Sequence, residues 1–392
     1  MTSNLDHEPT LVSFSLICFP PLVYKTPTYT YSLQLRQPSH SLTDYNGRYE
    51  KENALCAPRQ LRPEGFKDNP RLYVIRNPEW QGWVLDEAES IKHIKAAYDA
   101  GINTFDTANA YSNGLSEVIL GNAIKQLKLP REEIVVMTKV FFIVGRTPGE
   151  NVRTHKDPDQ AGYVNQRGLS RKHIFDSVKK SLERLQLDYI DLLQCHRFDP
   201  DTPIEETMQA LHDVVKAGWV RYVGMSSCHA WQFAAMQNYA INNKLTPFIS
   251  MQNHYNLIYR EEEREMFPSL DWFGVGSIPW SPIARGILCR PLTGTTKRKE
   301  TDQYLNGYTT DTSPTQEIIK RVEEIAKKKG VSMAQVSLAW VMSKPGVTAP
   351  IVGTTSLDNL NDLIASVNVE LTPEEIKQLE EPYKPIAIFG HM

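Results

Sequence analysis

The chain has 392 residues, of which 41% are hydrophobic and 23% are charged, and its formal net charge at pH 7 is -3. This composition is typical of a globular protein with one large domain or two smaller ones. The nearly balanced charge gives no electrostatic signal for binding nucleic acid or an anionic membrane. The five cysteines include no Cys-x-x-Cys pair, which argues against a disulfide framework or a structural zinc site.

Residues 1–70 differ from the rest of the chain because they are rich in Pro, Ser, Tyr and Asn and show no sustained periodicity. We expect a disordered or irregular extension there, followed by a folded domain over residues 71–392. The apolar run LVSFSLICF (residues 11–19) is too short to span a bilayer, and no Lys or Arg precedes it. We therefore expect a cytoplasmic protein without a membrane partner.

From residue 72 onward, apolar strand-like runs alternate with amphipathic segments. Seven runs are legible, at residues 102–108, 133–140, 189–196, 220–227, 247–254, 275–282 and 347–355. Helical spacing is clearest at residues 88–101, 171–187, 205–218, 314–330 and 333–344. Strands that alternate with helices predict right-handed βαβ units and a parallel sheet.

Two α/β architectures fit this pattern, an open doubly wound sheet or a (β/α)8 TIM barrel with one obscured strand. We favour the barrel because no G-x-G-x-x-G motif follows the first legible strand. A barrel needs every strand paired on both sides. Only residues 72–75 lie at the right distance to act as an altered first strand, so we predict that they pair between residues 102–108 and 347–355. Residues 1–60 should then contribute no core strand.

Polar side chains lie where these strands end, which is where a barrel places its chemistry. In chain order they are Asp106, with Tyr111 five residues later, Lys139, His196, Ser226, Ser227, Gln252, Asn253, Trp280 and Ser281. Each one alone has an ordinary explanation as a turn, cap or solvated strand end. It is much harder to explain by chance that a carboxylate, a phenol, an ammonium group and an imidazole meet at one barrel mouth.

These four groups also form a chemical unit. A phenol has a reference pKa of about 10 and is a reluctant acid at neutral pH. A nearby ammonium group favours the phenolate, and a carboxylate keeps that ammonium charged and in place. Asp106 would thus hold Lys139, Lys139 would assist Tyr111, and Tyr111 would give its proton to a developing alkoxide. His196 would donate a hydrogen bond to the same oxygen.

Three other motifs favour structural interpretations. Cys195 precedes His196, but neighbours on a strand point to opposite faces, so we expect Cys195 to pack outward under a helix. His229, beside Cys228, has no further ligands within reach by sequence, so no metal site is expected. The acidic run EEEREMF (residues 261–267) is predicted to start a helix.

Several segments resemble the aldo-keto reductase superfamily, and within it the fungal group of aryl-alcohol dehydrogenase-like and versiconal hemiacetal acetate reductase-like members. The segments are GINTFDTANAYSNG, VVMTKVFF, DLLQCHRFD, YVGMSS, MQNHYN and WSPIARGIL, and the similarity runs from about residue 78 to the end. The resemblance implies a (β/α)8 barrel and an NADP-dependent oxidoreductase. It assigns a catalytic tetrad of Asp106, Tyr111, Lys139 and His196.

The resemblance also implies that NADPH lies extended across the barrel top. Ser226 and Gln252 would hold the nicotinamide carboxamide, with Ser227 beside them in place of the Asn of many relatives, and the ring would stack on Trp280. The pyrophosphate would be wrapped by Ser281, Pro282, Ile283, Ala284, Arg285 and Gly286. The adenosine phosphate end would lie against Gly353, Thr354, Thr355, Asn359 and Asp362, where several relatives instead show Arg or Gln and then Glu-Asn.

We expect the protein to reduce aldehydes or ketones to alcohols, with a small carbonyl substrate that is aryl or polyketide-derived. Residues 141–168 and the tail, residues 381–392, would shape the pocket. The aromatic candidates for its lining are Phe141, Phe142, Trp80, Trp83, Tyr255 and Phe389. An alternative is a catalytically weak nucleotide-binding regulatory subunit, like the potassium-channel β subunits of this superfamily. A damaged gene product is a third interpretation, which rests on the unusual N-terminal stretch alone. No obligate protein partner is evident.

Overall fold

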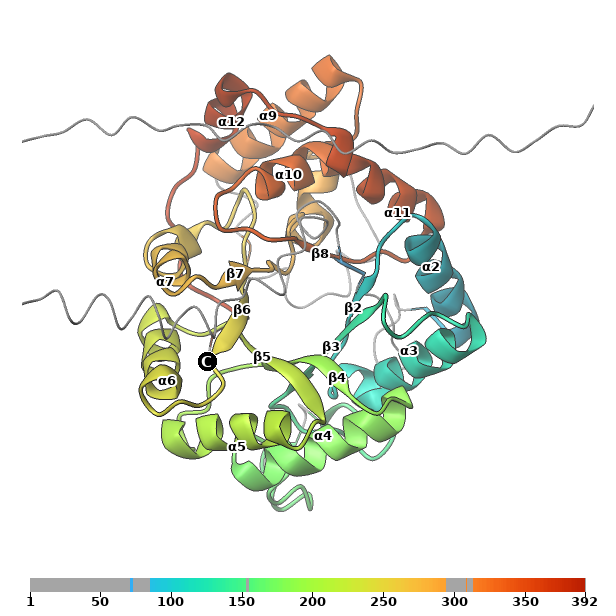
Figure 1. Cartoon of the computed structure of the whole chain (residues 1–392). Coiled ribbons are helices and arrows are strands. Elements are labelled where there is room, and N and C mark those ends of the chain that lie inside the picture. Colours follow the sequence, from blue (N-terminus) through green and yellow to red (C-terminus); the bar gives the residue numbers. More distant parts are fainter. Residues whose placement is uncertain (1–70, 73–84, 153–154, 294–307, 309–312, 392) are drawn as a thin grey trace, which may run out of the picture. The chain divides into compact units, whose positions relative to one another are not determined.

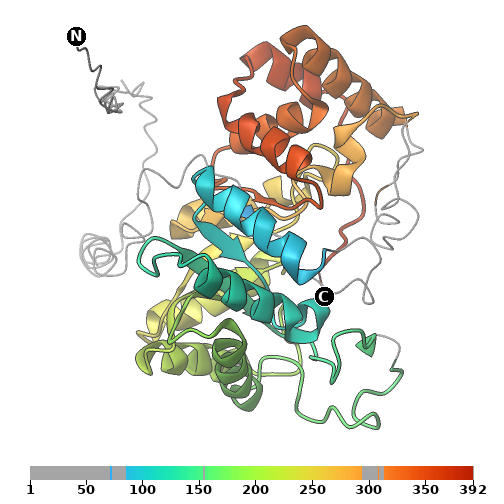
Figure 2. The same cartoon turned by 90° about the vertical axis from the view of Figure 1, so that its right-hand side faces the viewer.

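The computed structural model describes residues 71–72, 85–152, 155–293, 308 and 313–391 (Figures 1 and 2). All of these residues belong to one compact unit, Cys56–Met392. The predictions for the N-terminal extension and for the apolar run at residues 11–19 fall outside the described residues. They stay predictions, as does the division of the chain at residue 70.

The described residues form one sheet of eight parallel strands in the order β7-β6-β5-β4-β3-β2-β1-β8. The strands are β1 (Arg71–Leu72), β2 (Thr104–Asp106), β3 (Val135–Val140), β4 (Ile190–Cys195), β5 (Val220–Ser226), β6 (Phe248–Gln252), β7 (Gly276–Ser277) and β8 (Ile351–Val352). The two ends of this order meet, because Ser277 pairs with Val347 and the Ile351 amide donates to the Pro279 carbonyl at 2.7 Å. The sheet therefore closes into the predicted (β/α)8 barrel, and the open doubly wound alternative is wrong.

The first strand lies where the sequence predicts it. Leu72 is opposite Phe105 of β2 on one side and Val352 of β8 on the other. The described part of β1 is Arg71–Leu72, while residues 73–75 of the predicted strand fall outside the described residues. A short segment just before the resembling region thus closes the barrel, as the need to pair both edges requires.

Helices surround the strands on all sides in the view along the barrel (Figure 1). They and the short 3-10 turns are α2 (Glu87–Asp99), η3 (Tyr111–Gly114), α3 (Leu115–Gln126), α4 (Arg171–Leu185), α5 (Ile204–Lys216), α6 (Ala230–Asn242), η5 (Glu261–Glu263), α7 (Met266–Phe273), η6 (Ala284–Cys289), α9 (Ser313–Lys329), α10 (Met333–Met342), α11 (Leu357–Ile364), η8 (Ala365–Asn368) and α12 (Pro373–Glu380). Helices α9 and α12 contact each other and lie outside α10, so they add a second layer on one side of the barrel.

Short polar side chains set where several of these helices begin. The side chains of Asp86, Ser170, Ser332, Ser356 and Thr372 each accept a hydrogen bond from the backbone amide three residues further on. Such caps satisfy amide donors that the first helical turn leaves without an intrahelical partner. The N-cap residue of α6 is His229, so the other explanation of Ser226 and Ser227, that they cap this helix, is wrong.

The strands alternate between two environments, and this alternation positions the site. On β3, Val136 and Val140 join the large apolar core between the sheet and the helices. The intervening residues of β3 include Met137 and Lys139, which therefore face the other side, the barrel interior. The same rule applies on β4, where Cys195 lies in the outer core as predicted. Burial raises the pKa of the Cys195 thiol, so this residue is a packing group and not a nucleophile.

No helix within the described ranges combines the length and apolar character that crossing a membrane requires.

Candidate active site

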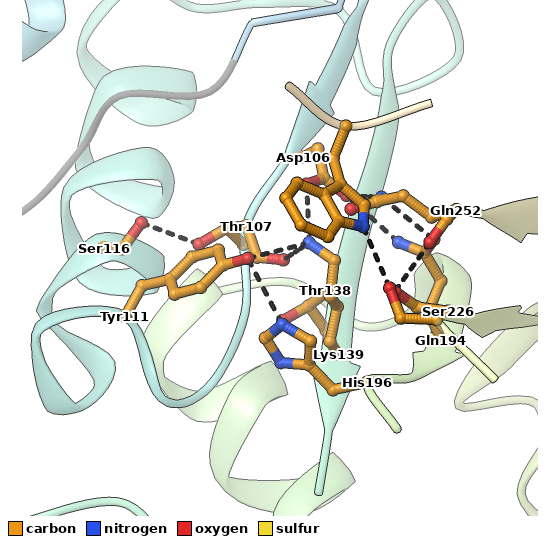
Figure 3. Close-up of polar contacts among 12 residues, drawn as sticks. Asp106, Thr107, Tyr111, Ser116, Thr138, Lys139, Gln194, His196, Ser226 and Gln252 are labelled. Carbon is orange, nitrogen blue, oxygen red and sulfur yellow. Dashed lines mark hydrogen bonds and ion pairs between the residues drawn. The ribbon is translucent and has the colours of Figure 1, made fainter. Parts of the chain in front are cut away.

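Lys139 is the centre of a polar cluster at the carboxyl ends of β2, β3 and β4 (Figure 3). Its Nζ atom lies 2.6 Å from Asp106 Oδ2 and 2.8 Å from the carbonyl oxygen of Thr107. The side chains of Lys139 and Asp106 are both fully buried. A buried ammonium group is stable only when it is paired and hydrogen-bonded, and these two oxygens satisfy that need.

Tyr111 brings its phenol to the same place from the short turn η3 that follows β2. The Tyr111 Oη atom lies 3.4 Å from Lys139 Nζ and 3.4 Å from His196 Nε2 (Figure 3). The Tyr111 and His196 rings meet edge to face with their centroids 5.5 Å apart. Tyr111 is partly exposed, whereas Asp106, Lys139 and His196 are buried. The structure thus brings the four predicted residues together, with the phenol as the accessible member.

Asp106 is held by a second set of contacts that the sequence did not reveal. Its Oδ1 atom accepts hydrogen bonds from Gln194 Nε2 and Gln252 Nε2, each at 3.0 Å. The two amides also contact each other, with Gln252 Nε2 donating to Gln194 Oε1 at 3.1 Å. Gln194 could have been found from the period of β4, because it lies two residues before His196 and so faces the same side.

The four residues predicted to hold the nicotinamide end lie at or after strand ends: Ser226 ends β5 and Ser227 follows it, Gln252 ends β6, and Trp280 lies after β7. Ser226 Oγ donates to the Gln252 carbonyl oxygen at 2.8 Å, which ties β5 to β6. The indole nitrogen of Trp280 donates to Ser227 Oγ at 2.9 Å. The structure therefore gathers these residues on the barrel mouth beside the Lys139 cluster, since Gln252 contacts Asp106 directly.

The predicted pyrophosphate loop has an unusual backbone. Ser281, Ala284, Arg285 and Gly286 all adopt positive φ values, of 53°, 48°, 55° and 95°. Left-handed residues in a turn can direct successive backbone N–H groups toward one point, which suits an anion. The guanidinium group of Arg285 lies 5.9 Å from the centre of the Trp280 ring, so the loop and the indole belong to one neighbourhood. Pro282 and Ile283 complete this loop, and Pro282 is buried.

The predicted adenosine-phosphate residues lie at and after β8. Gly353, Thr354 and Thr355 form the turn between β8 and α11, and Asn359 lies in the first turn of α11. Asp362 lies further along α11, where its carboxylate accepts hydrogen bonds from Ser332 Oγ at 2.7 Å and Gln335 Nε2 at 2.8 Å. Asp362 thus fastens α11 to the start of α10, a structural contact that the sequence did not predict.

Trp280 is supported by His254, which sequence reasoning also missed. The two rings stack at 4.1 Å with 8° between their planes, and the Tyr259 ring stacks on the other face of His254 at 4.1 Å. Burial lowers the pKa of His254 well below its usual value, and the nearby Arg285 charge acts in the same direction. His254 is therefore a neutral stacking group that covers one face of the indole.

The C-terminal tail reaches this aromatic group. Phe389 contacts the rings of His254 and Tyr259 edge to face. Gly390 comes so close to the indole that an added Cβ atom would lie 3.2 Å from a Trp280 ring carbon. His391 Nε2 lies 3.1 Å from Glu262 Oε1, and both side chains are almost fully buried. The acidic run at residues 261–267 starts η5 as predicted, and it also anchors the tail.

Four of the six aromatic residues proposed for the substrate pocket are described, and Phe389 is the one already placed on the rings of His254 and Tyr259. Phe142 lies beside His196, with ring centroids 5.0 Å apart, and Phe141 packs edge to face on Phe142. Tyr255 was wrongly assigned, because it is fully buried in the core beneath α10 and stacks on Trp340 there. Trp80 and Trp83 fall outside the described residues. Among those that are described, no group of three or more His, Cys, Asp or Glu side chains could hold a metal ion.

The structure is thus a closed parallel barrel with a buried lysine–carboxylate pair and a phenol at its mouth, the end where barrel enzymes carry their catalytic residues. A sequence model of the Aldo/keto reductase family matches residues 76–384, which is most of the chain. The chain belongs to the Aldo/keto reductase family, as its motifs predicted.

Curated relatives share close to half of their residues with this chain. A versiconal hemiacetal acetate reductase from Aspergillus parasiticus is 50% identical over 318 residues, which are 80% of this chain and 92% of the relative. An aldo-keto reductase from Alternaria alternata is 46% identical over 327 residues, or 81% and 88% of the two chains. A Schizosaccharomyces pombe protein, provisionally named as an aryl-alcohol dehydrogenase, is 47% identical over 330 residues, or 80% and 98%.

Proposed function

We propose that the protein reduces aldehydes or ketones to alcohols with NADPH and that Tyr111 is the general acid. One observation carries this proposal, the placement of the Tyr111 hydroxyl 3.4 Å from both Lys139 Nζ and His196 Nε2. A phenol between an ammonium group and an imidazole can release its proton to a substrate oxygen, because the ammonium stabilises the phenolate left behind.

Each residue of the cluster has a separate role in this proposal. NADPH, when bound, supplies the hydride that a carbonyl carbon accepts during reduction. Tyr111 gives its proton to the carbonyl oxygen as negative charge develops there. His196 orients that oxygen by hydrogen bonding. Lys139 stabilises the phenolate, and Asp106, fixed by Gln194 and Gln252, keeps Lys139 charged and in position.

The residues around Trp280 fit a dinucleotide. The positive φ values of Ser281, Ala284, Arg285 and Gly286 suit a loop whose amides face a pyrophosphate, and Arg285 adds a positive charge. Ser226 and Gln252 would hold the carboxamide, and the nicotinamide would stack on the indole face opposite His254. Thr354, Thr355 and Asn359, at the start of α11, would meet the adenosine phosphate, which is the basis for proposing NADPH over NADH.

The substrate class is the finer part of the proposal. Phe142 beside His196 would give the carbonyl site an aromatic wall, which favours an aryl or polyketide-derived carbonyl compound. The names of two relatives, a versiconal hemiacetal acetate reductase and an aryl-alcohol dehydrogenase, agree with such substrates. We further propose that the protein acts in the cytoplasm on a small molecule, without nucleic acid, a membrane or an obligate protein partner.

The test is a pair of measurements on the purified full chain. Loss of NADPH absorbance is followed with a panel of aromatic and aliphatic aldehydes and ketones, and cofactor binding is followed separately by NADPH fluorescence. Turnover that is faster with aromatic carbonyls and with NADPH than with NADH is expected. Binding of NADPH without turnover on any carbonyl would favour the regulatory-subunit alternative, and failure to bind either cofactor would overturn the proposal.

A further inference from the structure

Asn113 joins the turn that carries Tyr111 to the long loop between β3 and α4. The described parts of this loop, which runs from residue 141 to residue 170, extend away from the helices in Figure 2. Asn113 Nδ2 donates to the carbonyl oxygens of Thr147 and Glu150, both at 2.8 Å. Asn113 Oδ1 accepts from the Gly145 amide at 2.9 Å. One side chain thus makes three short hydrogen bonds to the backbone of one loop segment, residues 145–150, and a longer one to the Pro148 carbonyl oxygen at 3.5 Å.

The backbone at Asn113 has a left-handed conformation. Ser112 and Asn113 have φ values of 45° and 50°, and Gly114 follows at 93°. Non-glycine residues rarely adopt this region, and Asn tolerates it better than most. Gly145 matches it from the other side, because a Cβ atom there would lie 2.7 Å from Asn113 Nδ2. Strain of this kind persists where the surroundings fix it, which is common at functional sites.

The loop segment that Asn113 holds has its own internal frame around Glu150. The Glu150 carboxylate accepts hydrogen bonds from the Tyr163 hydroxyl and from the Arg146 amide, and it lies 3.1 Å from His155 Nε2. The hydrogen bonds from Tyr163 and His155 lower the pKa of Glu150 to about 2. The carboxylate is therefore ionised at ordinary pH. Its hydrogen bonds fix the backbone of residues 145–150 in the conformation to which Asn113 is hydrogen-bonded.

The same loop also reaches the other side of the phenol. Its first residues include Phe142, whose ring lies 5.0 Å from the His196 ring, centroid to centroid. The loop thus begins beside His196. A few residues later it is hydrogen-bonded to Asn113, which lies two positions after Tyr111. Because Tyr111 and His196 face the same substrate oxygen in the proposed reaction, a shift of this loop would alter both.

We propose that Asn113 is a positioning residue that fixes the loop at residues 145–150 against the Tyr111 turn. It thereby holds the phenol at its distance from Lys139 and holds Phe142 as the aromatic wall for an aryl carbonyl. The proposal deepens the proposed function and rests on it. The hydrogen bonds from Asn113 and the close fit of Gly145 carry the proposal.

The test compares three variants of the full chain. Asn113→Gly removes the three hydrogen bonds and relieves the positive φ, so any loss comes from the side chain and not from backbone strain. Gly145→Ala disturbs the same contact from the loop and leaves the Tyr111 turn intact. Asp159→Asn is the matched control, because it breaks an exposed ion pair with Arg167 in the same loop, away from Asn113.

We expect kcat for an aromatic aldehyde to fall about 10- to 100-fold in Asn113→Gly, since small misplacements of reacting groups have effects of this size. The pH profile of kcat should shift, KM for the aromatic aldehyde should rise more than KM for a small aliphatic one, and the NADPH Kd should not change. Gly145→Ala should act in the same direction and Asp159→Asn should not. Limited trypsin digestion should cleave faster at Arg146 in Asn113→Gly and in Gly145→Ala, but not in Asp159→Asn.

An unchanged kcat and pH profile in Asn113→Gly would overturn the positioning role, even if trypsin cleavage became faster. If the wild type reduced no carbonyl at all, the proposed function would fail. Digestion alone would then test whether Asn113 fixes the loop at residues 145–150. Faster cleavage at Arg146 in Asn113→Gly than in Asp159→Asn would support this role in that case, and equal cleavage at Arg146 would overturn it.

Discussion

Lys139 Nζ and Asp106 Oδ2 lie 2.6 Å apart, and water reaches neither side chain. Removing one partner of such a pair leaves an uncompensated buried charge, which typically costs about 3–5 kcal/mol. The pair therefore contributes to folding as well as to the proposed chemistry, and the two contributions must be separated by experiment.

Lys139→Met should lower the free energy of unfolding by about 3–5 kcal/mol, because it leaves the buried Asp106 carboxyl group without its ion-pair partner. The double variant Asp106→Asn/Lys139→Met should recover much of the loss, since no charge is left in the interior. Urea denaturation measures both. Equal instability of the single and double variants would show that the charge is not the cause.

Tyr111→Phe should bind NADPH as the wild type does but lose the positioned acid, which typically lowers the rate 10²- to 10⁴-fold. Its fold should be unaffected, because the Tyr111 hydroxyl lies 3.4 Å from its polar neighbours and is partly exposed. Stopped-flow or steady-state NADPH oxidation measures the rate. Turnover at the wild-type rate would remove Tyr111 from its assigned role.

Glu150 gives the loop after β3 a defined acid sensitivity. Hydrogen bonds from Tyr163 and His155 lower its pKa from 4.5 to about 2 in the folded protein. A lowered folded-state pKa stabilises the fold above the unfolded value, and this contribution is lost as pH falls from 4.5 toward about 2. The wild type should thus have a higher Tm than Glu150→Gln at neutral pH, and the difference should shrink over that window. A difference that stays constant down to the acid end would contradict this.

Gly390→Ala should weaken cofactor binding more than it slows chemistry. The φ value of Gly390 is 89°, and an added Cβ atom would lie 3.2 Å from the Trp280 ring. Either the tail or the indole must then move, and the proposed nicotinamide stack moves with it. NADPH titration should show a raised Kd with little change in kcat. Ala387→Ser, at an exposed position of the same tail, is the control and should bind normally.

A chain that lacks residues 1–60 should fold and bind NADPH, because β1 begins at Arg71. Removal of residues 1–75 should instead leave the facing edges of β2 and β8 without a partner, and the product should aggregate. Circular dichroism and size-exclusion chromatography distinguish the two outcomes. A 1–60 truncation that does not fold would show that the earlier part of the chain supports the barrel.

The sequence revealed the features that follow from strand period and strand order. Asp106, Lys139 and His196 could be predicted to meet because parallel strands of a barrel end at one face. Leu72 could be placed because a barrel tolerates no gap. Contacts between segments far apart in the chain left no such pattern, and the tail residue Phe389 on His254 is an example. The sequence pattern does not predict the path of a loop either.

Tyr255 shows where prediction from strand periodicity fails. An aromatic side chain three positions after the end of β6 looked like a pocket residue, yet the chain turns back there, with Asn256 paired to Tyr259. This turn carries Tyr255 beneath α10, where its hydroxyl donates to Glu263 at 2.5 Å. Periodicity ends with the strand, so the direction of a side chain beyond that point depends on the turn that follows.

The first half of the barrel contributes the proposed acid of the site, and the second half contributes its candidate cofactor residues. Asp106, Tyr111, Lys139 and His196 come from β2 to β4, and Ser226 and the residues after it come from β5 onward. An exchange of half-barrels between relatives, joined after β4, would therefore deliver a new cofactor preference to an intact proton donor. Such a chimera has one structural requirement. The incoming half must present an amide where Gln252 reaches Asp106 at 3.0 Å, because that hydrogen bond crosses the junction.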